Sequence, residues 1–243
     1  MKKLSFCISC KNRFYQISRT LPVNMDHNRE LSGDIEFVLV DFGSTDGFKD
    51  WINSNFANER SSGYLKVFAT NEMSSWHMSK AKNTTHINAC GDILVNLDAD
   101  NFTGPQGAAY VLQQFNKFGR ELLLHQFSGD FQDGSCGRIS VVKEFFYTSG
   151  GYDQSFKPLG YDDIDFIRRL QALGLNYKRS PDNRYNRSIQ NSKSESLMHC
   201  DIDMSWEQMD IWNANMSLGN ILAGNFVANL ESSPGISGCK ILD

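Results

Sequence analysis

The fold of this chain is decided by the stretch Asp92-Ile93-Leu94-Val95-Asn96-Leu97-Asp98-Ala99-Asp100-Asn101, where an apolar run stops on two carboxylates. Its mostly aliphatic part, residues 93–97, is typical of a parallel strand covered on both faces. In an open α/β sheet, ligands bind beyond the carboxyl ends of the strands. Asp98 and Asp100, with Asn101 beside them, would offer hard oxygen ligands there for Mg²⁺ or Mn²⁺. An isolated Asp-x-Asp is more often part of a solvated loop, so its meaning depends on the rest of the chain.

The preceding residues alternate between strand and helix patterns. Strands are expected at 4–9, 35–40 and 64–69, and helices at 14–21, from about 48, and at 78–90. Pro22 is predicted to end the first helix, because proline lacks a backbone N–H. The second strand also closes on an acid, Asp41. This βαβαβαβ order predicts a parallel, doubly wound sheet.

The pattern changes after Asn101. Helices are expected at 105–118, 143–148 and 206–230, and strands at 121–127 and 137–142. Asp162 and Asp163 stand at a further helix start, where negative charge is favourable. The polar stretch 180–196 is typical of a mobile loop, either a lid over a site or a plain surface loop. The apolar residues of the last helix are expected to pack in the core, and an acceptor wall or a subunit contact is the alternative; they are Trp206, Met209, Trp212, Met216 and Ile221.

Composition restricts the class of protein. The 243 residues are 40% hydrophobic and 21% charged, with a net charge of -4, which is typical of a globular protein and offers no basic field for nucleic acid. Six scattered cysteines do not suggest a disulfide framework. The first residues are too short and polar for a signal segment or a membrane span. We expect a cytoplasmic protein, and the sequence leaves open whether it docks peripherally on the inner membrane face.

Four motifs in order resemble the GT-A glycosyltransferases of family 2. They are Cys7-Ile8-Ser9-Cys10-Lys11-Asn12-Arg13, Val40-Asp41-Phe42-Gly43-Ser44-Thr45-Asp46-Gly47, Leu97-Asp98-Ala99-Asp100, and Gly150-Gly151-Tyr152-Asp153 ahead of Asp162-Asp163. Residues 137–170 are also similar to the carboxyl-terminal part of the β-1,4-galactosyltransferases. The resemblance implies one α/β GT-A domain over residues 1–243, with a mostly parallel sheet flanked by helices. Within it, 1–101 would be the nucleotide-binding half, 102–200 the acceptor half and 201–243 a helical segment.

The resemblance implies a metal site. Asp98 would approach the donor ribose and Asp100 would bind the metal. His199, in Leu-Met-His, stands where the galactosyltransferases have a further metal ligand. An imidazole beside carboxylates favours Mn²⁺ over Mg²⁺. The alternative for His199 is a packed or surface histidine.

The resemblance also implies a site for the nucleotide. Asp41 matches the acid that accepts the imide proton of uracil, while Phe42 replaces a second acid and makes the base pocket more apolar. Lys80 matches a basic residue facing uridine and diphosphate, with Lys82 as the other candidate and a solvated surface lysine as the alternative. The first-strand residues that would line the nucleotide are Ser9, Lys11 and Arg13.

Two acids would act on the acceptor. Asp163 matches the general base that removes the proton of the attacking hydroxyl, and Asp162 replaces the glutamate that holds the acceptor. Leu159 stands where the galactosyltransferases have a tryptophan that stacks on the acceptor sugar, so their acceptor specificity cannot be transferred. Other aromatic residues that could supply a stacking face are Tyr161, Phe156 and Trp76.

The sequence therefore predicts a metal-dependent, inverting glycosyltransferase. It would transfer a sugar from a UDP-sugar to a hydroxyl of a glycan or a lipid-linked saccharide. Three alternatives remain at this point: a retaining glycosyltransferase, a degenerate GT-A module that binds without turnover, and a nucleotidyltransferase on a similar sheet. The last normally needs a glycine-rich phosphate loop after the first strand, and Lys11-Asn12-Arg13 contains no glycine.

Overall fold

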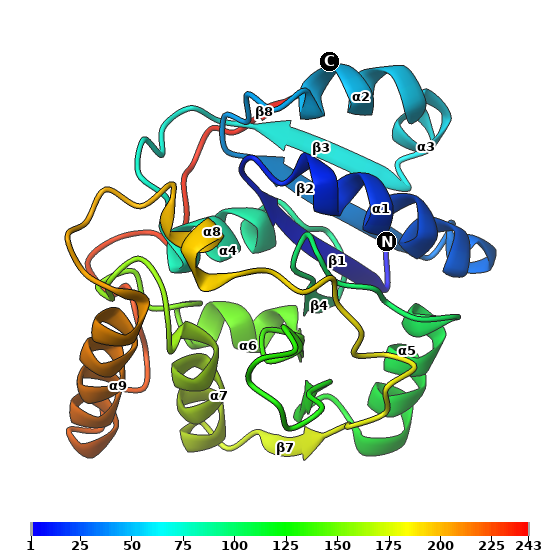
Figure 1. Ribbon diagram of the computed structural model, residues 1–243. Helices are drawn as coiled ribbons and strands as arrows, with labels where there is room; N and C mark the ends of the chain where they lie inside the picture. Colours follow the sequence, from blue (N-terminus) through cyan, green and yellow to red (C-terminus); the bar gives the residue numbers. More distant parts are fainter. Residues whose placement is uncertain (1, 243) are drawn as a thin grey trace.

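The computed structural model describes residues 2–242, which form an α/β structure around one sheet (Figure 1). The strands lie in the order β7-β5-β6-β4-β1-β2-β3-β8. Their bounds are β1 (Leu4–Cys10), β2 (Ile35–Asp41), β3 (Leu65–Ala69), β4 (Ile93–Asn96), β5 (Leu122–His125), β6 (Ile139–Val142), β7 (Asn176–Arg179) and β8 (Lys240–Ile241).

The centre of the sheet is parallel. Strands β4, β1, β2 and β3 run in one direction, so their carboxyl ends meet at one edge. The strand β6 is antiparallel to both β4 and β5, β7 is parallel to β5, and β8 is an antiparallel edge strand. The predicted α/β class with a mostly parallel sheet is confirmed.

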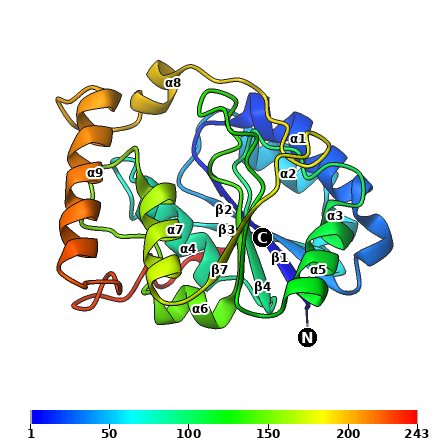
Figure 2. The same cartoon turned by 90° about the horizontal axis from the view of Figure 1, so that it is seen from below.

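Helices cover both faces of the sheet (Figure 2). Their bounds are α1 (Phe14–His27), α2 (Phe48–Asn55), α3 (Ala57–Ser61), α4 (Met78–Ile87), α5 (Gly107–Phe118), α6 (Lys143–Thr148), α7 (Asp162–Ala172), α8 (Lys193–Leu197) and α9 (Trp206–Leu222). Alternating side chains of β1 enter different cores: Phe6 packs in the cluster that includes Ile17 of α1, and Cys7 packs in the cluster that includes Phe146 of α6. This alternation follows from the two-residue period of a strand.

The prediction that Pro22 ends the first helix is wrong, because α1 continues through Pro22 to His27. A proline in a helix interior costs about 3 kcal/mol. Leu21 and Met25 are fully buried against the sheet, and burying such a side chain contributes roughly 1.5–3 kcal/mol. The free energy gained by burying the apolar face of α1 therefore offsets the cost of the backbone hydrogen bond that Pro22 cannot make.

The last helix differs from its prediction in length and in packing. It ends at Leu222 instead of 230, and it buries Met209, Asn213 and Ser217 while Trp212 is 51% exposed. The prediction of core packing is therefore confirmed for Met209 and wrong for Trp212. None of the helices within residues 2–242 is long and apolar enough to cross a membrane.

Candidate active site

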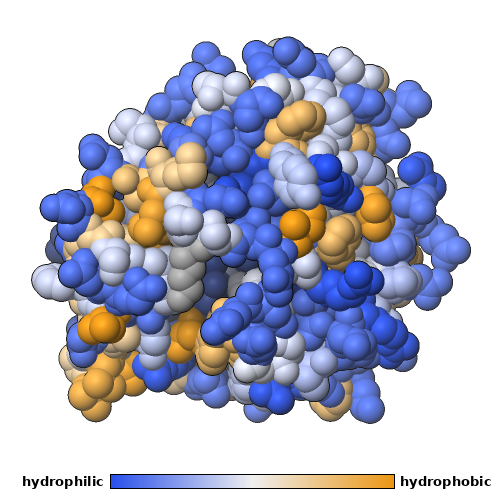
Figure 3. Space-filling model, viewed as in Figure 1, coloured by the Kyte–Doolittle hydropathy of each residue, from blue (hydrophilic) through white to orange (hydrophobic). Residues whose placement is uncertain are grey.

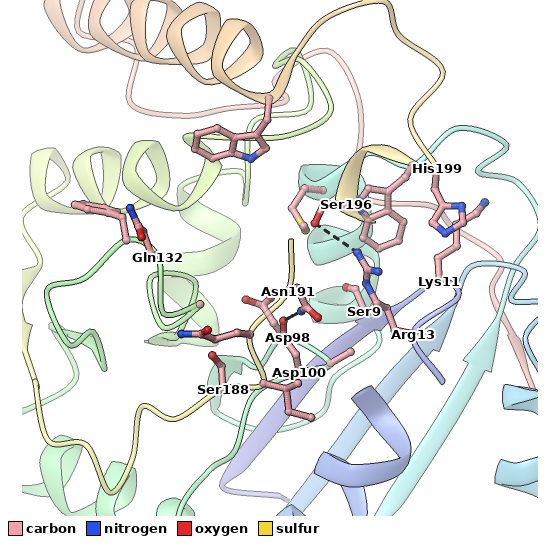
Figure 4. Close-up of a pocket in the computed structure, with 18 residues that line it drawn as sticks. Ser9, Lys11, Arg13, Asp98, Asp100, Gln132, Ser188, Asn191, Ser196 and His199 are labelled. Atoms are coloured by element: carbon pink, nitrogen blue, oxygen red, sulfur yellow. Dashed lines mark hydrogen bonds between the residues drawn. The ribbon is translucent and has the colours of Figure 1, made fainter. Parts of the chain in front are cut away.

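A cavity of about 470 Å³ lies beyond the carboxyl ends of the central strands. The surface on this side is mainly hydrophilic and is hollowed near its centre (Figure 3). Ser9, Lys11 and Arg13 reach the cavity from the end of β1, Asp98 and Asp100 from the end of β4, and Ser188, Asn191, Ser196 and His199 from the segment that follows β7 (Figure 4). The predicted loop at 180–196 therefore contributes to the wall of the cavity.

The two acids after β4 are held in a network of amides. Asn96 Nδ2 donates to Asp98 Oδ1 over 3.1 Å, and Asn101 Nδ2 donates to Asp100 Oδ1 over 2.6 Å. Asn191 Nδ2 donates to the other oxygen of Asp100. Burial, and then the neighbouring charge of Asp98, raise the pKa of Asp100 to about 7. Ionising Asp98 and Asp100 at the same time, with no cation present, is therefore unfavourable.

Polar residues of α1 fix the backbone of the loop at residues 98–103, which follows β4 and is called the acidic loop below. Thr20 Oγ1 donates to the carbonyl of Ala99 over 2.6 Å, and Asn24 Nδ2 donates to the carbonyl of Asn101 over 2.8 Å. Asn24 Oδ1 also accepts the backbone N–H of Thr103 at 2.8 Å. These buried hydrogen bonds attach the turn at residues 99–103 to helix α1. The positions of Asp98 and Asp100 are thereby fixed relative to that helix.

Arg138 fixes the same loop from the opposite side. Its buried guanidinium donates to the carbonyl of Phe102 over 2.6 Å, to Asn101 Oδ1, and to the carbonyls of Tyr185 and Arg187. Burial lowers the pKa of this guanidinium to about 10. Arg138 therefore connects the acidic loop to the segment that follows β7.

The two acids at the start of α7 share one buried lysine. Lys82 Nζ of α4 lies 2.7 Å from Asp162 Oδ2 and 2.6 Å from Asp163 Oδ1, and the Lys82 side chain is 2% exposed. Burial raises the pKa of Asp163 to about 7; the Lys82 charge opposes this, while Asp162 and Asp98 add to it. Asp163 is therefore poised to exchange a proton near neutral pH.

Gly137 shows that the two acidic regions meet. A Cβ atom on this glycine would lie 2.6 Å from Asp98 Oδ2 and 3.2 Å from Asp163 Oδ2. Both carboxylates thus face the same short piece of backbone just before β6. Residues far apart in the chain, at the ends of β4 and the start of α7, converge on one place.

The other end of the cavity is basic. Lys11 Nζ donates to the carbonyl of Met73 over 3.0 Å, and Arg13 donates to Ser196 Oγ over 3.4 Å. Burial, then the charges of Arg13 and Lys11, lower the pKa of His199. His199 therefore lies with the cations, as Figure 4 also shows, and this end suits an anionic group.

Two predicted nucleotide residues do not line the main cavity. Asp41 is buried behind Lys11, where its carboxylate accepts the backbone N–H of Ser44 at 3.1 and 3.3 Å. Burial raises the pKa of Asp41, and the Lys11 charge opposes this. Lys80 lines a separate cavity of about 280 Å³ together with Glu72.

Solved structures share this architecture at low sequence identity. The mannosyltransferase PcManGT from Pyrobaculum calidifontis, in complex with GDP-Man and Mn²⁺, has a TM-score of 0.60 and 18% identity, covering 74% of this chain and 55% of its own. S. aureus TarS 1–349 in complex with UDP-GlcNAc has a TM-score of 0.63 and 15% identity, covering 78% and 59%. GalNAc-T7 with UDP, GalNAc and Mn²⁺ has a TM-score of 0.61 and 16% identity, covering 74% and 43%. The fold is that of the GT-A glycosyltransferases.

The likeness establishes the GT-A fold alone, because the identities are so low. This chain spans little more than half the length of the first two neighbours. No protein-family model and no curated protein sequence matches it. Membership of family 2 and similarity to the β-1,4-galactosyltransferases stay predictions.

On this GT-A fold, the carboxylates of Asp98 and Asp100 fit a divalent cation. They offer oxygen ligands, and a cation would stabilise the ionised pair against burial and mutual repulsion, which together raise the pKa of Asp100. Within residues 2–242, no three His, Cys, Asp or Glu side chains gather closely enough to hold a metal ion together. His199 therefore does not complete a site with the two acids here, and its role as a ligand stays a prediction.

Several side chains at the site could not be found from the GT-A motifs. Asn191 and Ser196 lie in a polar stretch whose composition predicts only a loop, and Gly137 is the first residue of an ordinary strand pattern. The sequence offers Lys82 as a candidate for the donor diphosphate and gives no sign of its contacts with the two acids of α7. Asp41 and Asp98 are marked by the apolar runs that precede them, and Asp162 and Asp163 by a helix start, whereas these residues carry no comparable local signal.

Proposed function

We propose that this chain is a metal-dependent, inverting glycosyltransferase that moves a sugar from a UDP-sugar to a hydroxyl of a glycan or lipid-linked saccharide. The proposal rests above all on the convergence of Asp98 and Asp163 at Gly137. Of these residues, Asp98 also lines the cavity with a basic end, together with Asp100. This convergence supports Asp163 as the base and Asp100 as a metal ligand, and Lys82 lies beside Asp163. The GT-A fold and the Mn²⁺ and nucleotide sugars of its neighbours add support.

The basic end would receive the diphosphate. Lys11 and Arg13 supply positive charge there, and Asp98 is proposed to bind the ribose. Asp41 is proposed to accept the imide N–H of uracil beyond Lys11, close to Ser9. Asp100 would hold a Mn²⁺ or Mg²⁺ ion, with His199 as the candidate for a further ligand. Such an ion would supply positive charge to neutralise the nucleoside diphosphate.

Asp163 would act as the general base. It removes the proton of the acceptor hydroxyl while the hydroxyl oxygen attacks the anomeric carbon from the face opposite the leaving group. A single carboxylate is sufficient for this inverting reaction. Asp162 would orient the acceptor, and Lys82, which contacts both carboxylates, keeps them in place.

The central test compares Asp163→Asn with the wild-type chain in the presence of Mn²⁺. A screen of nucleotide sugars first finds the donor by the release of nucleoside diphosphate. Asp163→Asn should bind UDP with near wild-type affinity in calorimetry but lose transfer by on the order of a hundredfold or more. Asp203→Asn, at an exposed position, is the matched control. Wild-type turnover in Asp163→Asn would place the base elsewhere.

The same preparation separates the alternatives. Inverted anomeric configuration in the product, read by NMR, would distinguish the proposal from a retaining enzyme. UDP binding without turnover of any donor would instead indicate a degenerate binding module. A failure to bind any nucleoside diphosphate with Mn²⁺ would refute the proposed function as a whole.

A further inference from the structure

We propose that residues 190–196 form an autoinhibitory strap, whose side chains occupy the proposed cation and diphosphate sites until the ligands displace them. The inference rests on the proposed function and concerns the regulation of the same site. Two hydrogen bonds carry it. Asn191 Nδ2 donates to a carboxylate oxygen of Asp100, and Arg13 donates to Ser196 Oγ over 3.4 Å. Figure 4 shows both as dashed lines.

The amide of Asn191 competes with a cation for Asp100. It donates to one carboxylate oxygen, while Asn101 Nδ2 donates to the other over 2.6 Å. An ionised carboxylate is an acceptor only, so N–H donors and a metal ion bind the same lone pairs. A cation that takes the oxygen facing Asn191 therefore has to displace this amide.

The guanidinium of Arg13 is held by the other half of the strap. It lies 3.9 Å from Glu195 Oε2, in addition to its hydrogen bond with Ser196 Oγ. Carboxylate and phosphate oxygens accept from a guanidinium in the same geometry. A diphosphate that binds Arg13 therefore competes with Glu195 and Ser196.

Helix α1 fixes the orientation of Asn191. The buried Gln16 donates from Nε2 to Asn191 Oδ1 over 2.8 Å, which leaves the amide nitrogen of Asn191 to face Asp100. Thr20 and Asn24, which hold the acidic loop, follow Gln16 one and two turns later on the same face of the helix. One face of α1 therefore holds both the acid and the strap that covers it.

The strap is attached by side chains between two firmer ends. Just before it, the backbone N–H of Ile189 donates to the carbonyl of Asp100 over 2.8 Å. Just after it, Leu197 packs against the apolar cluster that includes Trp76, and the His199 carbonyl accepts the backbone N–H of Trp76 at 2.7 Å. The hydrogen bonds from the strap to the site described above all use side chains. The strap can therefore open while the backbone contacts at its ends stay in place.

Autoinhibition gives substitutions in the strap an unusual sign. Removing a side chain that binds a ligand weakens binding, whereas removing one that blocks the site strengthens it, because the competent fraction of the protein rises. Glu195 offers the sharpest contrast. By charge alone, loss of a carboxylate near a cation site weakens cation binding. Release of the strap predicts the opposite.

The test titrates Mn²⁺ alone into the full chain and follows free Mn²⁺ by electron paramagnetic resonance. Asn191→Ala should bind Mn²⁺ about tenfold more tightly than wild type. Glu195→Gln should bind it about two- to fivefold more tightly, although this carboxylate pairs with Arg13 and not with the acids. Asn55→Ala, on the exposed surface of α2, and Ser194→Ala, exposed on the strap itself, are the matched controls and should bind as wild type does.

Calorimetric titration with UDP in the presence of Mn²⁺ separates the two proposals. Tighter Mn²⁺ binding by both Asn191→Ala and Glu195→Gln supports the strap. If either variant binds Mn²⁺ only as well as wild type, or more weakly, the inference is overturned, and normal UDP binding by the wild-type chain leaves the proposed function standing. A wild-type chain that binds Mn²⁺ but no UDP would overturn the proposed function itself.

Discussion

Replacing Lys82 by methionine tests the buried charge cluster most directly. Methionine keeps a flexible apolar chain but removes the ammonium group that lies within 2.7 Å of both Asp162 and Asp163. Breaking a buried ion pair by removing one partner costs about 3–5 kcal/mol, because the remaining charges stay buried without compensation. We expect Lys82→Met to lower the free energy of unfolding by that amount at pH 8.

The loss should depend on pH in a defined direction. The folded-state pKa of Asp163 is already raised to about 7, and removing Lys82 raises it further. A carboxyl group with a raised folded-state pKa destabilises the folded protein when it is ionised, and protonation relieves this. The destabilisation should therefore be largest at pH 8 and smaller at pH 5. The alkaline-rising limb of transfer activity should also move upward by roughly one pH unit or more, since each unit corresponds to 1.36 kcal/mol.

Urea denaturation at the two pH values and a pH profile of transfer measure these effects. Lys49→Met, on the exposed surface of α2, is the matched control and should change neither stability nor the profile. If Lys82→Met unfolds within about 0.5 kcal/mol of wild type at pH 8 and keeps the wild-type profile, the ion pairs are not what holds Asp163. The reasoning about this cluster would then be refuted.

Three further predictions address the metal site, the close approach of Gly137 to Asp98 and Asp163, and acid stability. Asp100→Ala should abolish metal-dependent UDP binding in calorimetry, and an unchanged dependence on Mn²⁺ would remove Asp100 from the ligands. Gly137→Ala places a Cβ 2.6 Å from Asp98 Oδ2; with overpacking at about 1–3 kcal/mol, UDP affinity and transfer should fall about tenfold or more. Gly33→Ala, where a Cβ has open space, should bind and transfer as wild type does. Burial lowers the pKa of His86 to about 4 from 6.5, so its unfolded form binds more protons between these pH values. The contribution of neutral His86 to stability should be complete above pH 6.5 and fall by about 3 kcal/mol as the pH drops toward 4. In His86→Gln this slope should flatten, and equal slopes would show that another group controls acid unfolding.

The arrangement of strands and acids could be predicted because its signals are local. Apolar runs that stop on Asp41 and Asp98 mark strand ends, and parallel order brings such ends to one edge of the sheet. The pair Asp162 and Asp163 at a helix start is equally local. Side-chain periodicity and spacing along the chain were sufficient for these elements, including the short helix α6, whose predicted bounds match those observed.

Contacts across the fold could not be predicted in this way. Lys82 reaches acids 80 and 81 residues away, and Arg138 binds carbonyls on both sides of the acidic loop. The antiparallel insertion of β6 between β4 and β5 brings Gly137 to the acids, yet nothing local distinguishes that glycine from others.

The sequence by itself determined which residues could carry the chemistry and at which end of the sheet they lie, since short-range periodicity encodes strands, helices and their ends. Only the tertiary structure decided which of them touch. Burial in the packed fold pairs Lys82 with Asp163 and raises the pKa of that acid to about 7. It also leaves Lys80 beside a different cavity. Such outcomes depend on distances between elements and on exclusion of water, and a linear pattern contains neither.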